Sequence, residues 1–214
     1  MKSIFIKLAL CLFLISIVTF NANSQTLGYE WAKGIGEDLK DMGYSITIDD
    51  TSNIYVAGHF SNVVDFDPGS GVTSLTGGDQ TKFFAKYNSS GDLVWAHCLD
   101  GGTVQMGSGI TISLDKSNNI YLAGGFEGTI DFDPGTGVNS ISATVLTDIF
   151  FAKYDNSGNL IWVNSLRGSM AGTQGTEHIQ DLAIDTLGNI YVTGNFYGTI
   201  DFNAGGGVAN LTSV

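Results

Sequence analysis

The sequence predicts an all-β chain assembled from repeated four-stranded antiparallel units. Three observations carry this prediction: two sequence blocks recur in the same order, short alternating segments take the place of any helical pattern, and turn residues separate these segments. Together they indicate one architecture repeated along the chain rather than several unrelated domains.

The repeat consists of two interleaved blocks. NIYVAGHFSNVVDFDPGSGV (53–72) and NIYLAGGFEGTIDFDPGTGV (119–138) are identical at thirteen of twenty positions, and NIYVTGNFYGTIDFNAGGGV (189–208) matches the second copy equally well. The second block follows in phase, because FFAKYNSSGDLVW (83–95) and FFAKYDNSGNLIW (150–162) agree at nine of thirteen positions. Two blocks that share one period predict a repeated structural unit.

Four segments of the first unit have the composition of strands. They are residues 45–49, 53–60, 82–87 and 93–97. In the second of them, Ile54, Val56 and Phe60 lie on one side, while Tyr55 and Ala57 lie on the other. Because both faces are largely apolar, we expect sheets that are covered on both sides.

Turn residues stand between the predicted strands. The first hairpin of each unit begins with Asp, at 49–53, 115–119 and 185–189, and Asn118 and Gly188 occupy the position that favours positive φ, with Ser52 as the weaker copy. The later hairpins, 88–91 and 155–158, end in glycine, which is typical of a type I turn followed by a glycine bulge. We therefore interpret these acids as turn formers first and ligand candidates second.

A four-stranded unit of about 65 residues that stacks face to face on its copies is a propeller blade. The coils of a β-solenoid are much shorter, and a β-sandwich gives no reason for the repeat. The predicted fold class is an all-β β-propeller of four-stranded antiparallel blades, incomplete, with about two and a half blades present. The predicted domains are a cleaved signal peptide (1–24) and a partial propeller (25–214), which divides into a closing outer strand (25–36), two blades (37–101 and 102–168) and a truncated blade (169–214).

Two and a half blades do not close a ring, which needs at least four. An uncovered blade face of roughly 350 Å² leaves about 8 kcal/mol of apolar burial unused, which is comparable to the stability of a whole domain. We therefore expect the sequence to be part of a longer protein, with self-association through the exposed blade faces as the alternative.

These motifs resemble a known family. The order Asn-Ile-Tyr-Val-x-Gly-x-Phe, Asp-Phe-Asp-Pro-Gly and Phe-Phe-Ala-Lys-Tyr-Asp-x-x-Gly-x-Leu-x-Trp is similar to the seven-bladed propeller-type (SBBP) repeats, over nearly all of residues 27–208. The resemblance implies a surface or secreted protein of Bacteroidetes-like bacteria, with export by the type IX route. It brings no catalytic residues to this chain.

The first 24 residues have the layout of a secretory signal. Lys2 and Lys7 precede the apolar run 8–20, and small residues stand before Gln25. This run is too short for a spanning helix, and the bulky Leu10 disfavours a lipid anchor at Cys11. Cleavage would make the net charge of −12 still more negative, so nucleic acid and anionic membranes are poor partners. It would leave Cys98 alone, without a disulfide partner.

The block DFDPG suggests the main ligand hypothesis. Its acids supply hard oxygen atoms for calcium, while Pro68 and the glycines favour a tight turn instead. Two carboxylates fall well short of the six to eight oxygen ligands that calcium takes, so the turn is the leading interpretation. The candidate calcium ligands are Asp65, Asp67, Asp131, Asp133, Asp201 and Asn203.

Catalytic patterns are weak. His59, His97 and His178 occupy unrelated positions of the repeat, and we expect each to be a surface or hydrogen-bonded strand histidine. Cys98 is interpreted as a small buried residue and the tryptophans as blade contacts rather than quinone-site residues: Trp31, Trp95 and Trp162. Glu177 and His178, in the insertion 170–178, are weak loop candidates.

Three functions remain open at this point. The first is a non-catalytic binding or scaffold module for an extracellular protein or glycan. The second is a calcium-stabilised structural module, and the third is the N-terminal part of a longer hydrolase or lyase whose active site lies in further blades. No cofactor is expected apart from calcium in the second case.

Overall fold

The computed structural model describes residues 28–37, 40–101, 109–144, 147–168, 177–203 and 207–213. The chain divides into two compact units, Met1–Glu30 and Trp31–Val214, and every described strand belongs to the second. The predicted signal segment lies outside the described residues. All described elements are strands, which confirms the all-β prediction. The described residues contain no helix that is long and apolar enough to cross a membrane.

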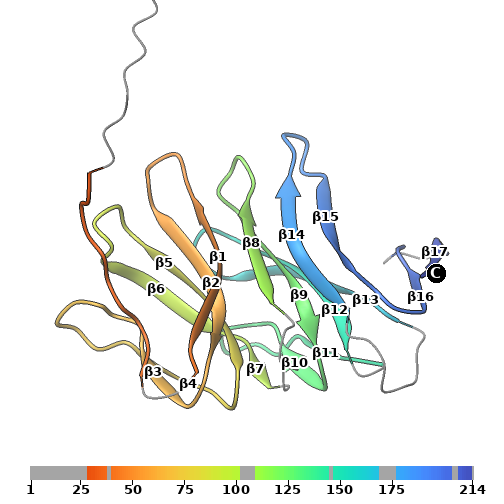
Figure 1. The fold of residues 1–214 in the computed structure, drawn as a ribbon, viewed down its shortest axis with the longest axis horizontal. Coiled ribbons are helices and arrows are strands. Elements are labelled where there is room, and N and C mark those ends of the chain that lie inside the picture. Colours follow the sequence, from red (N-terminus) through yellow and green to blue (C-terminus); the bar gives the residue numbers. More distant parts are fainter. Residues whose placement is uncertain are drawn as a thin grey trace, which may run out of the picture. The chain divides into compact units, whose positions relative to one another are not determined.

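The first repeat forms a four-stranded antiparallel sheet in the order β1-β2-β5-β6 (Figure 1). Its strands are β1 (Met42–Ile48), β2 (Ile54–Phe60), β5 (Thr81–Tyr87) and β6 (Leu93–Cys98). These are the four predicted strands, with ends that shift by up to three residues. The sequence pattern therefore predicts both the number and the antiparallel pairing of the strands.

The second repeat forms the same sheet, and the third forms its first hairpin. The second sheet has the order β13-β12-β9-β8, and β14 pairs with β15. The strands are β8 (Ile110–Leu114), β9 (Ile120–Phe126), β12 (Asp148–Tyr154), β13 (Leu160–Leu166), β14 (His178–Ile184) and β15 (Ile190–Asn195). Two complete four-stranded units and part of a third agree with the predicted blades.

A second kind of hairpin, which the sequence analysis missed, connects the strands of each unit. It contains the DFDPG block and lies outside the four-stranded sheet. Its strands are β3 (Val63–Asp65) with β4 (Ser74–Thr76), β10 (Thr129–Asp131) with β11 (Ser140–Ser142), and β16 (Thr199–Asp201) with β17 (Asn210–Thr212). A short strand β7 (Asp100–Gly101) pairs with β10. The return strands read Ser-Leu-Thr, Ser-Ile-Ser and Asn-Leu-Thr, and this recurring alternation was the available signal.

The predicted aspartate turns are confirmed at the start of each unit. Oδ1 of Asp49 accepts hydrogen bonds from the backbone N–H groups of Thr51 and Asn53, both at 2.9 Å, and Oδ2 accepts from the Asn53 amide at 2.8 Å. Asp115 and Asp185 hold the same bonds in their repeats. Burial raises the pKa of Asp49, but these donors outweigh burial and the net shift is downward. The turn acids are thus ionised carboxylates that accept hydrogen bonds from the backbone of their own turns.

The backbone of these turns adopts the positive φ values that the sequence predicts. Asn118 has φ of 58° and Gly188 of 85°, while Ser52 has 64°. Left-handed backbone is costly for most residues other than glycine and asparagine. Ser52 therefore occupies the least favourable of the three equivalent positions.

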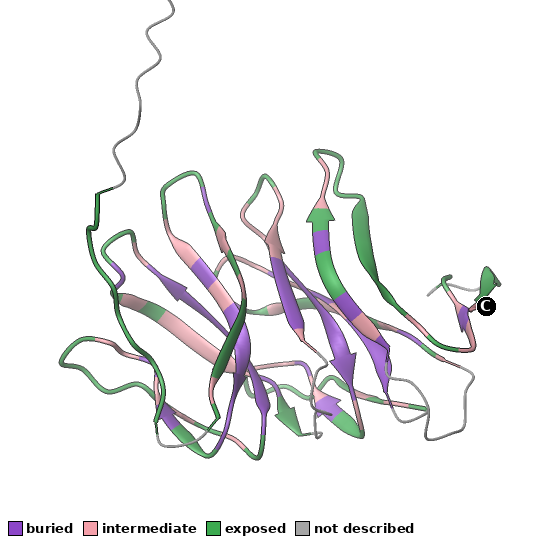
Figure 2. Ribbon diagram, in the orientation of Figure 1, coloured by how far each residue is buried: buried purple, intermediate pink, exposed green. Residues whose placement is uncertain are grey.

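The two faces of each sheet contribute to different cores. Tyr55 and Ala57 of β2 belong to the core that includes β8, β9 and β12 of the second sheet, whereas Phe60 belongs to a core with Phe66 and Phe83 beneath its own hairpin. Figure 2 shows the central strands as the most buried, and all seven residues of β5 and of β9 are buried. Coverage on both faces, predicted from the apolar composition, is confirmed for these strands.

Successive repeats pack through their first strands and through their hairpins. β1 contacts β8, and β8 contacts β14 (Figure 1). The Tyr55 hydroxyl donates a hydrogen bond of 2.9 Å to Asn156 in the β12–β13 hairpin. This bond joins the first sheet to the second.

The segment 31–37, part of the predicted closing strand, lies against the first sheet without forming a strand. The Trp31 indole donates to the Ser89 carbonyl at 3.3 Å, and Lys33 forms an ion pair of 2.9 Å with Asp92. No described strand lies beside this segment to complete a ladder of backbone bonds. Closure of a ring by this segment stays a prediction.

Candidate functional site

The DFDPG loops place a carboxylate where it holds both ends of the loop. Oδ1 of Asp65, the last residue of β3, accepts hydrogen bonds from the backbone N–H groups of Asp67 at 3.0 Å and of Thr73 at 2.8 Å. Asp131 and Asp201 make the equivalent pairs of bonds at the same distances. The bonds to Thr73 and Asp67 lower the pKa of Asp65. One side chain therefore fixes the loop in each repeat.

The second acid of the motif supports the tip of the loop. Oδ1 of Asp67 accepts a hydrogen bond of 2.8 Å from the N–H of Gly69, and Asp133 accepts the same bond from Gly135. A Cβ atom added at Gly71 or Gly137 would collide with the carboxylate of the same repeat. The carboxylate of Asp67 or Asp133 folds over the loop and leaves room only for glycine at position 71 or 137.

This geometry supports the turn interpretation, and the phenylalanine between the acids adds to it. Phe66 and Phe132 are fully buried, as expected for a ring under the blade edge, whereas Phe202 is 41% exposed. The described residues contain no group of three or more His, Cys, Asp or Glu side chains that could hold a metal. Calcium binding at the six candidate positions stays a prediction.

We expect the thermal unfolding midpoint of the full chain to be the same in 5 mM calcium chloride and in 5 mM EDTA. Each Asp already uses one oxygen for backbone N–H groups, so too few oxygen atoms remain for a six-coordinate ion. Differential scanning calorimetry measures the midpoint, with magnesium as the control for ionic strength. A calcium-specific rise that disappears in the Asp67→Asn, Asp133→Asn double variant would establish the calcium module instead.

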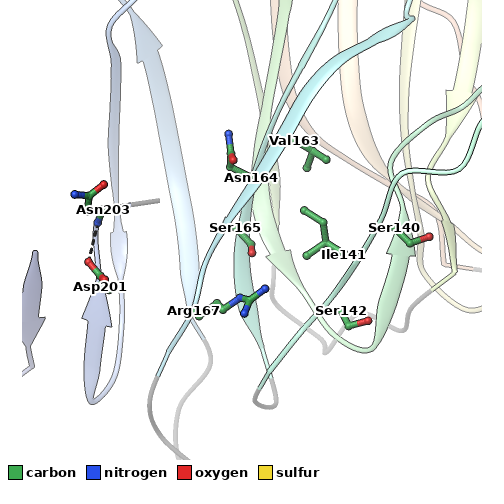
Figure 3. Close-up of a pocket in the computed structure, with 9 residues that line it drawn as sticks. All are labelled: Ser140, Ile141, Ser142, Val163, Asn164, Ser165, Arg167, Asp201 and Asn203. Atoms are coloured by element: carbon green, nitrogen blue, oxygen red, sulfur yellow. Dashed lines mark hydrogen bonds between the residues drawn. The ribbon is translucent and has the colours of Figure 1, made fainter. Parts of the chain in front are cut away.

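An open groove of about 620 Å³ lies between the second sheet and the third repeat (Figure 3). Strands β11 and β13 form one wall, and β16 with the residues after it forms the other. Figure 3 shows the Arg167 side chain between the two walls. The lining residues are Ser140, Ile141, Ser142, Val163, Asn164, Ser165, Arg167, Asp201 and Asn203.

Arg167 distinguishes this groove from the equivalent position one repeat earlier. It is the only arginine of the chain, it is exposed, and it forms no hydrogen bond or ion pair with the described residues. The corresponding residue of the first repeat is Asp100, which lies directly opposite Asp131 in the β7–β10 pair. A guanidinium therefore stands in this groove where the earlier repeat carries a carboxylate.

Arg167 was not among the predicted site residues, because the candidates came from positions that the repeats share and Arg167 is not such a position. A comparison of the two segments that follow the tryptophan strand, CLDGG and SLRGS, shows the change of charge. Of the candidate residues, the structure brings Asp201 and Asn203 into the groove and leaves the other four outside its lining.

Comparison with known families agrees with this architecture. The β-propeller repeat family, SBBP, matches residues 30–59 and 172–195. These segments belong to the first and third repeats, where the structure has the hairpins β1–β2 and β14–β15. The chain is a β-propeller repeat protein, and these two segments resemble the SBBP repeats.

The chain is also similar to an uncharacterized WD repeat-containing protein of Acanthamoeba polyphaga mimivirus. The two are 29% identical over 118 residues, which is 49% of this chain and 8% of the relative. The chain thus spans less than a tenth of the length of the relative that it matches.

The histidines of the SBBP repeats differ in environment, and the expectation for His59 was wrong. His59 is 2% exposed, and its Nε2 has no hydrogen-bond partner in the described part of the chain. It lies directly opposite the buried Lys82 on β5 and packs edge-on against Tyr44 at 5.1 Å. Desolvation, followed by the charge of Lys82, lowers the pKa of His59 and keeps the ring neutral.

The loop candidates of the third repeat, Glu177 and His178, are less exposed than we expected for residues of an insertion. Glu177 is 3% exposed, and burial together with the charge of Asp148 raises the pKa of its carboxyl group. His178 begins β14 and lines a small cavity of about 260 Å³ together with Thr111 of the second repeat and Tyr44 of the first. The rest of the insertion, residues 170–176, lies outside the described residues.

The tryptophans and the cysteine of the SBBP repeats have packing roles. Trp95 is partly buried against the core between the first two sheets, and Trp162 is partly buried against the next core. Trp31 is 40% exposed. Cys98 is half-buried, and burial raises the pKa of its thiol, so it is a poor nucleophile.

Proposed function

We propose that this β-propeller repeat chain is a non-catalytic binding module for an extracellular protein, and that the ligand binds in the groove of Figure 3. The observation that supports this most is the unpaired Arg167 between two walls of serine and asparagine side chains. A guanidinium binds a carboxylate through two parallel hydrogen bonds, and such charge-assisted bonds are the strong ones. The groove therefore suits a segment that carries a carboxylate.

The lining favours binding over catalysis. Its described residues include three serines but no histidine or lysine that would activate one of them. The two walls come from different repeats, which is a common place for ligand sites.

The ligand that fits best is an extended peptide with one acidic group. None of the described lining residues is aromatic, so they give a sugar no stacking surface, whereas the amide of Asn164 offers donors and an acceptor to a peptide backbone. A polyanion would be repelled by the net charge of −12. A glycan ligand is the alternative.

The location outside the cell is part of the same proposal. It is supported by the signal-like layout of residues 1–24 and by the acidic composition. Transport by the type IX route is supported only by the resemblance to the SBBP repeats. Detection of the protein in the culture medium, with an N-terminus at Gln25, would test both steps.

The full chain can be screened against a random dodecapeptide display library and against an array of bacterial and plant glycans. We expect the enriched peptides to share an Asp or Glu, and Arg167→Ala to weaken their binding by about tenfold or more. Lys116→Ala, which removes an exposed cation in the β8–β9 turn, is the matched control and should bind as the parent does. Enrichment of glycans alone would favour the alternative, and peptide binding that does not depend on Arg167 would contradict the proposed site.

A further inference from the structure

Two ionisable side chains lie buried opposite each other in the first repeat. His59, near the end of β2, pairs with Lys82 at the start of β5, and each side chain is 2% exposed. The second sheet is built without such a pair, because the residues in the equivalent positions are Gly125 and Ile149. The fold of a repeat therefore does not require ionisable groups at this place.

The pair faces the neighbouring repeats. Side chains alternate along a strand, so His59 lies on the same face of β2 as Tyr55, which belongs to the core shared with the second sheet. The His59 ring packs edge-on against Tyr44 of β1, with 5.1 Å between the ring centroids. Tyr44 in turn lines the cavity of about 260 Å³ to which Thr111 of β8 and His178 of β14 also contribute. One side chain thus separates His59 from the cavity between the first strands of three repeats (Figure 1).

The surroundings of the pair disfavour the binding of protons. Nε2 of His59 has no hydrogen-bond partner in the described part of the chain, so no acceptor there would receive a proton placed on it. Desolvation, followed by the charges of Lys82 and Lys40, lowers the pKa of His59. Burial also lowers the pKa of Lys82, and the charge of Lys82 contributes to the lowered pKa of His178 on β14.

The acids that act on His59 do not compensate for this. Asp41 and Asp79 raise the pKa of His59, but by less than desolvation and the two lysines lower it. Both carboxylates accept hydrogen bonds from Ser61, whose backbone N–H donates to Asp41 at 3.1 Å and whose hydroxyl donates to Asp79 at 3.2 Å. These acids are therefore held by the backbone and hydroxyl of the turn after β2.

We propose that the His59–Lys82 pair is an acid-sensitive contact: when both groups are protonated, this end of the first sheet opens while the second sheet stays closed. The segments that open are the start of β1, the end of β2 and the start of β5, which carry Tyr44, His59 and Lys82. Opening lets water reach the two charges and removes the desolvation that opposes them. It also withdraws Tyr44 from the cavity beside β8 and β14, so acid loosens the first repeat from its neighbours.

The direction of the pH dependence follows from the lowered pKa values. In the open state His59 and Lys82 titrate near about 6.5 and 10.4, and the closed state binds both protons less tightly. Opening is therefore favoured as the pH falls, by Lys82 between about 10.4 and about 7 and by His59 below about 6.5. Glu177 acts in the opposite sense, because burial and the charge of Asp148 raise its pKa, so exchange in β14 is not a suitable measure.

Hydrogen exchange of the full chain, measured by mass spectrometry between pH 8.5 and pH 5.5, tests the proposal. After correction for the intrinsic exchange rate, the protection of segments 42–46, 57–61 and 80–84 should fall by about tenfold or more. The equivalent segments of the second sheet, 123–127 and 147–151, contain neither ionisable residue of the pair, and their protection should change by less than about threefold.

A double variant, His59→Asn with Lys82→Ile, removes both groups. It introduces residue types that other repeats carry in these positions, as Asn195 and Ile149 show. The pH dependence of the three segments should be largely lost in this variant, and Lys116→Met, at an exposed position, should keep that of the parent. The comparison of the two sheets within the parent decides the matter if the double variant does not fold. Equal loss of protection in both sheets, no loss in the first sheet, or a loss that persists in the folded double variant would each overturn the proposal.

Discussion

Phe150→Ala is expected to lower the free energy of unfolding by about 4 kcal/mol, the cost of a large-to-small substitution at a fully buried aromatic residue. Phe150 is 0% exposed and packs on Phe126 and Phe132, with ring centroids 6.2 and 4.9 Å away. It also belongs to the core between the first two sheets, so its loss loosens one sheet and the contact between two. Denaturant unfolding followed by tryptophan fluorescence measures the change.

Ile161→Ala is the control for this experiment. Ile161 lies on β13 and is 50% exposed, so we expect a loss below about 1 kcal/mol. If Phe150→Ala also lowered the free energy of unfolding by less than about 1 kcal/mol, the first two sheets would not share a core in solution.

The second large effect concerns Lys82, which is 2% exposed in β5. Burial lowers the pKa of Lys82 to about 7, well below the value of about 10.4 expected for the unfolded chain. Between these values the unfolded state binds a proton that the folded state does not bind, so stability rises with pH. The contribution of this one group is about 1.4 kcal/mol per pH unit within that window.

Denaturant unfolding from pH 7 to pH 9.5 tests this expectation in the parent chain and in Lys82→Met. As the pH rises, the free energy of unfolding of the parent should increase relative to that of Lys82→Met. This difference isolates Lys82, because the thiol of Cys98 and the other groups titrate in both proteins. Lys116→Met, at an exposed position, should keep the slope of the parent. Equal slopes for the parent and Lys82→Met would show that Lys82 stays charged in the folded chain.

Local chemistry explains why most of the fold is readable from the sequence. Asp49 and its counterparts form the same turn wherever they occur, because their partners lie two and four residues further along the chain. Strand faces follow from alternation, so the separate cores of Tyr55 and Phe60 are implied by their positions in β2. The return strand β4 was missed because three residues between turns are too short to show a period.

The surroundings of single residues were harder to predict, since they depend on which repeat packs on which. His59 is in an ordinary strand position, and only the assembled sheet places it beside Lys82 without a partner for Nε2. Glu177 lies near the end of a long insertion, a position that favours exposure, yet it is buried. The groove around Arg167 is formed by β11 and β16, which lie 26 and 34 residues away in the chain, or about half a repeat.

The loop that Asp65 ties at both ends has a practical consequence. Because positions 67 and 73 are secured by one carboxylate, the residues between them are not needed to hold the hairpin together. Foreign sequence spliced into the tip would leave the sheet beneath it intact. The same holds at Asp131, so the first two repeats each offer a loop that can carry a grafted epitope.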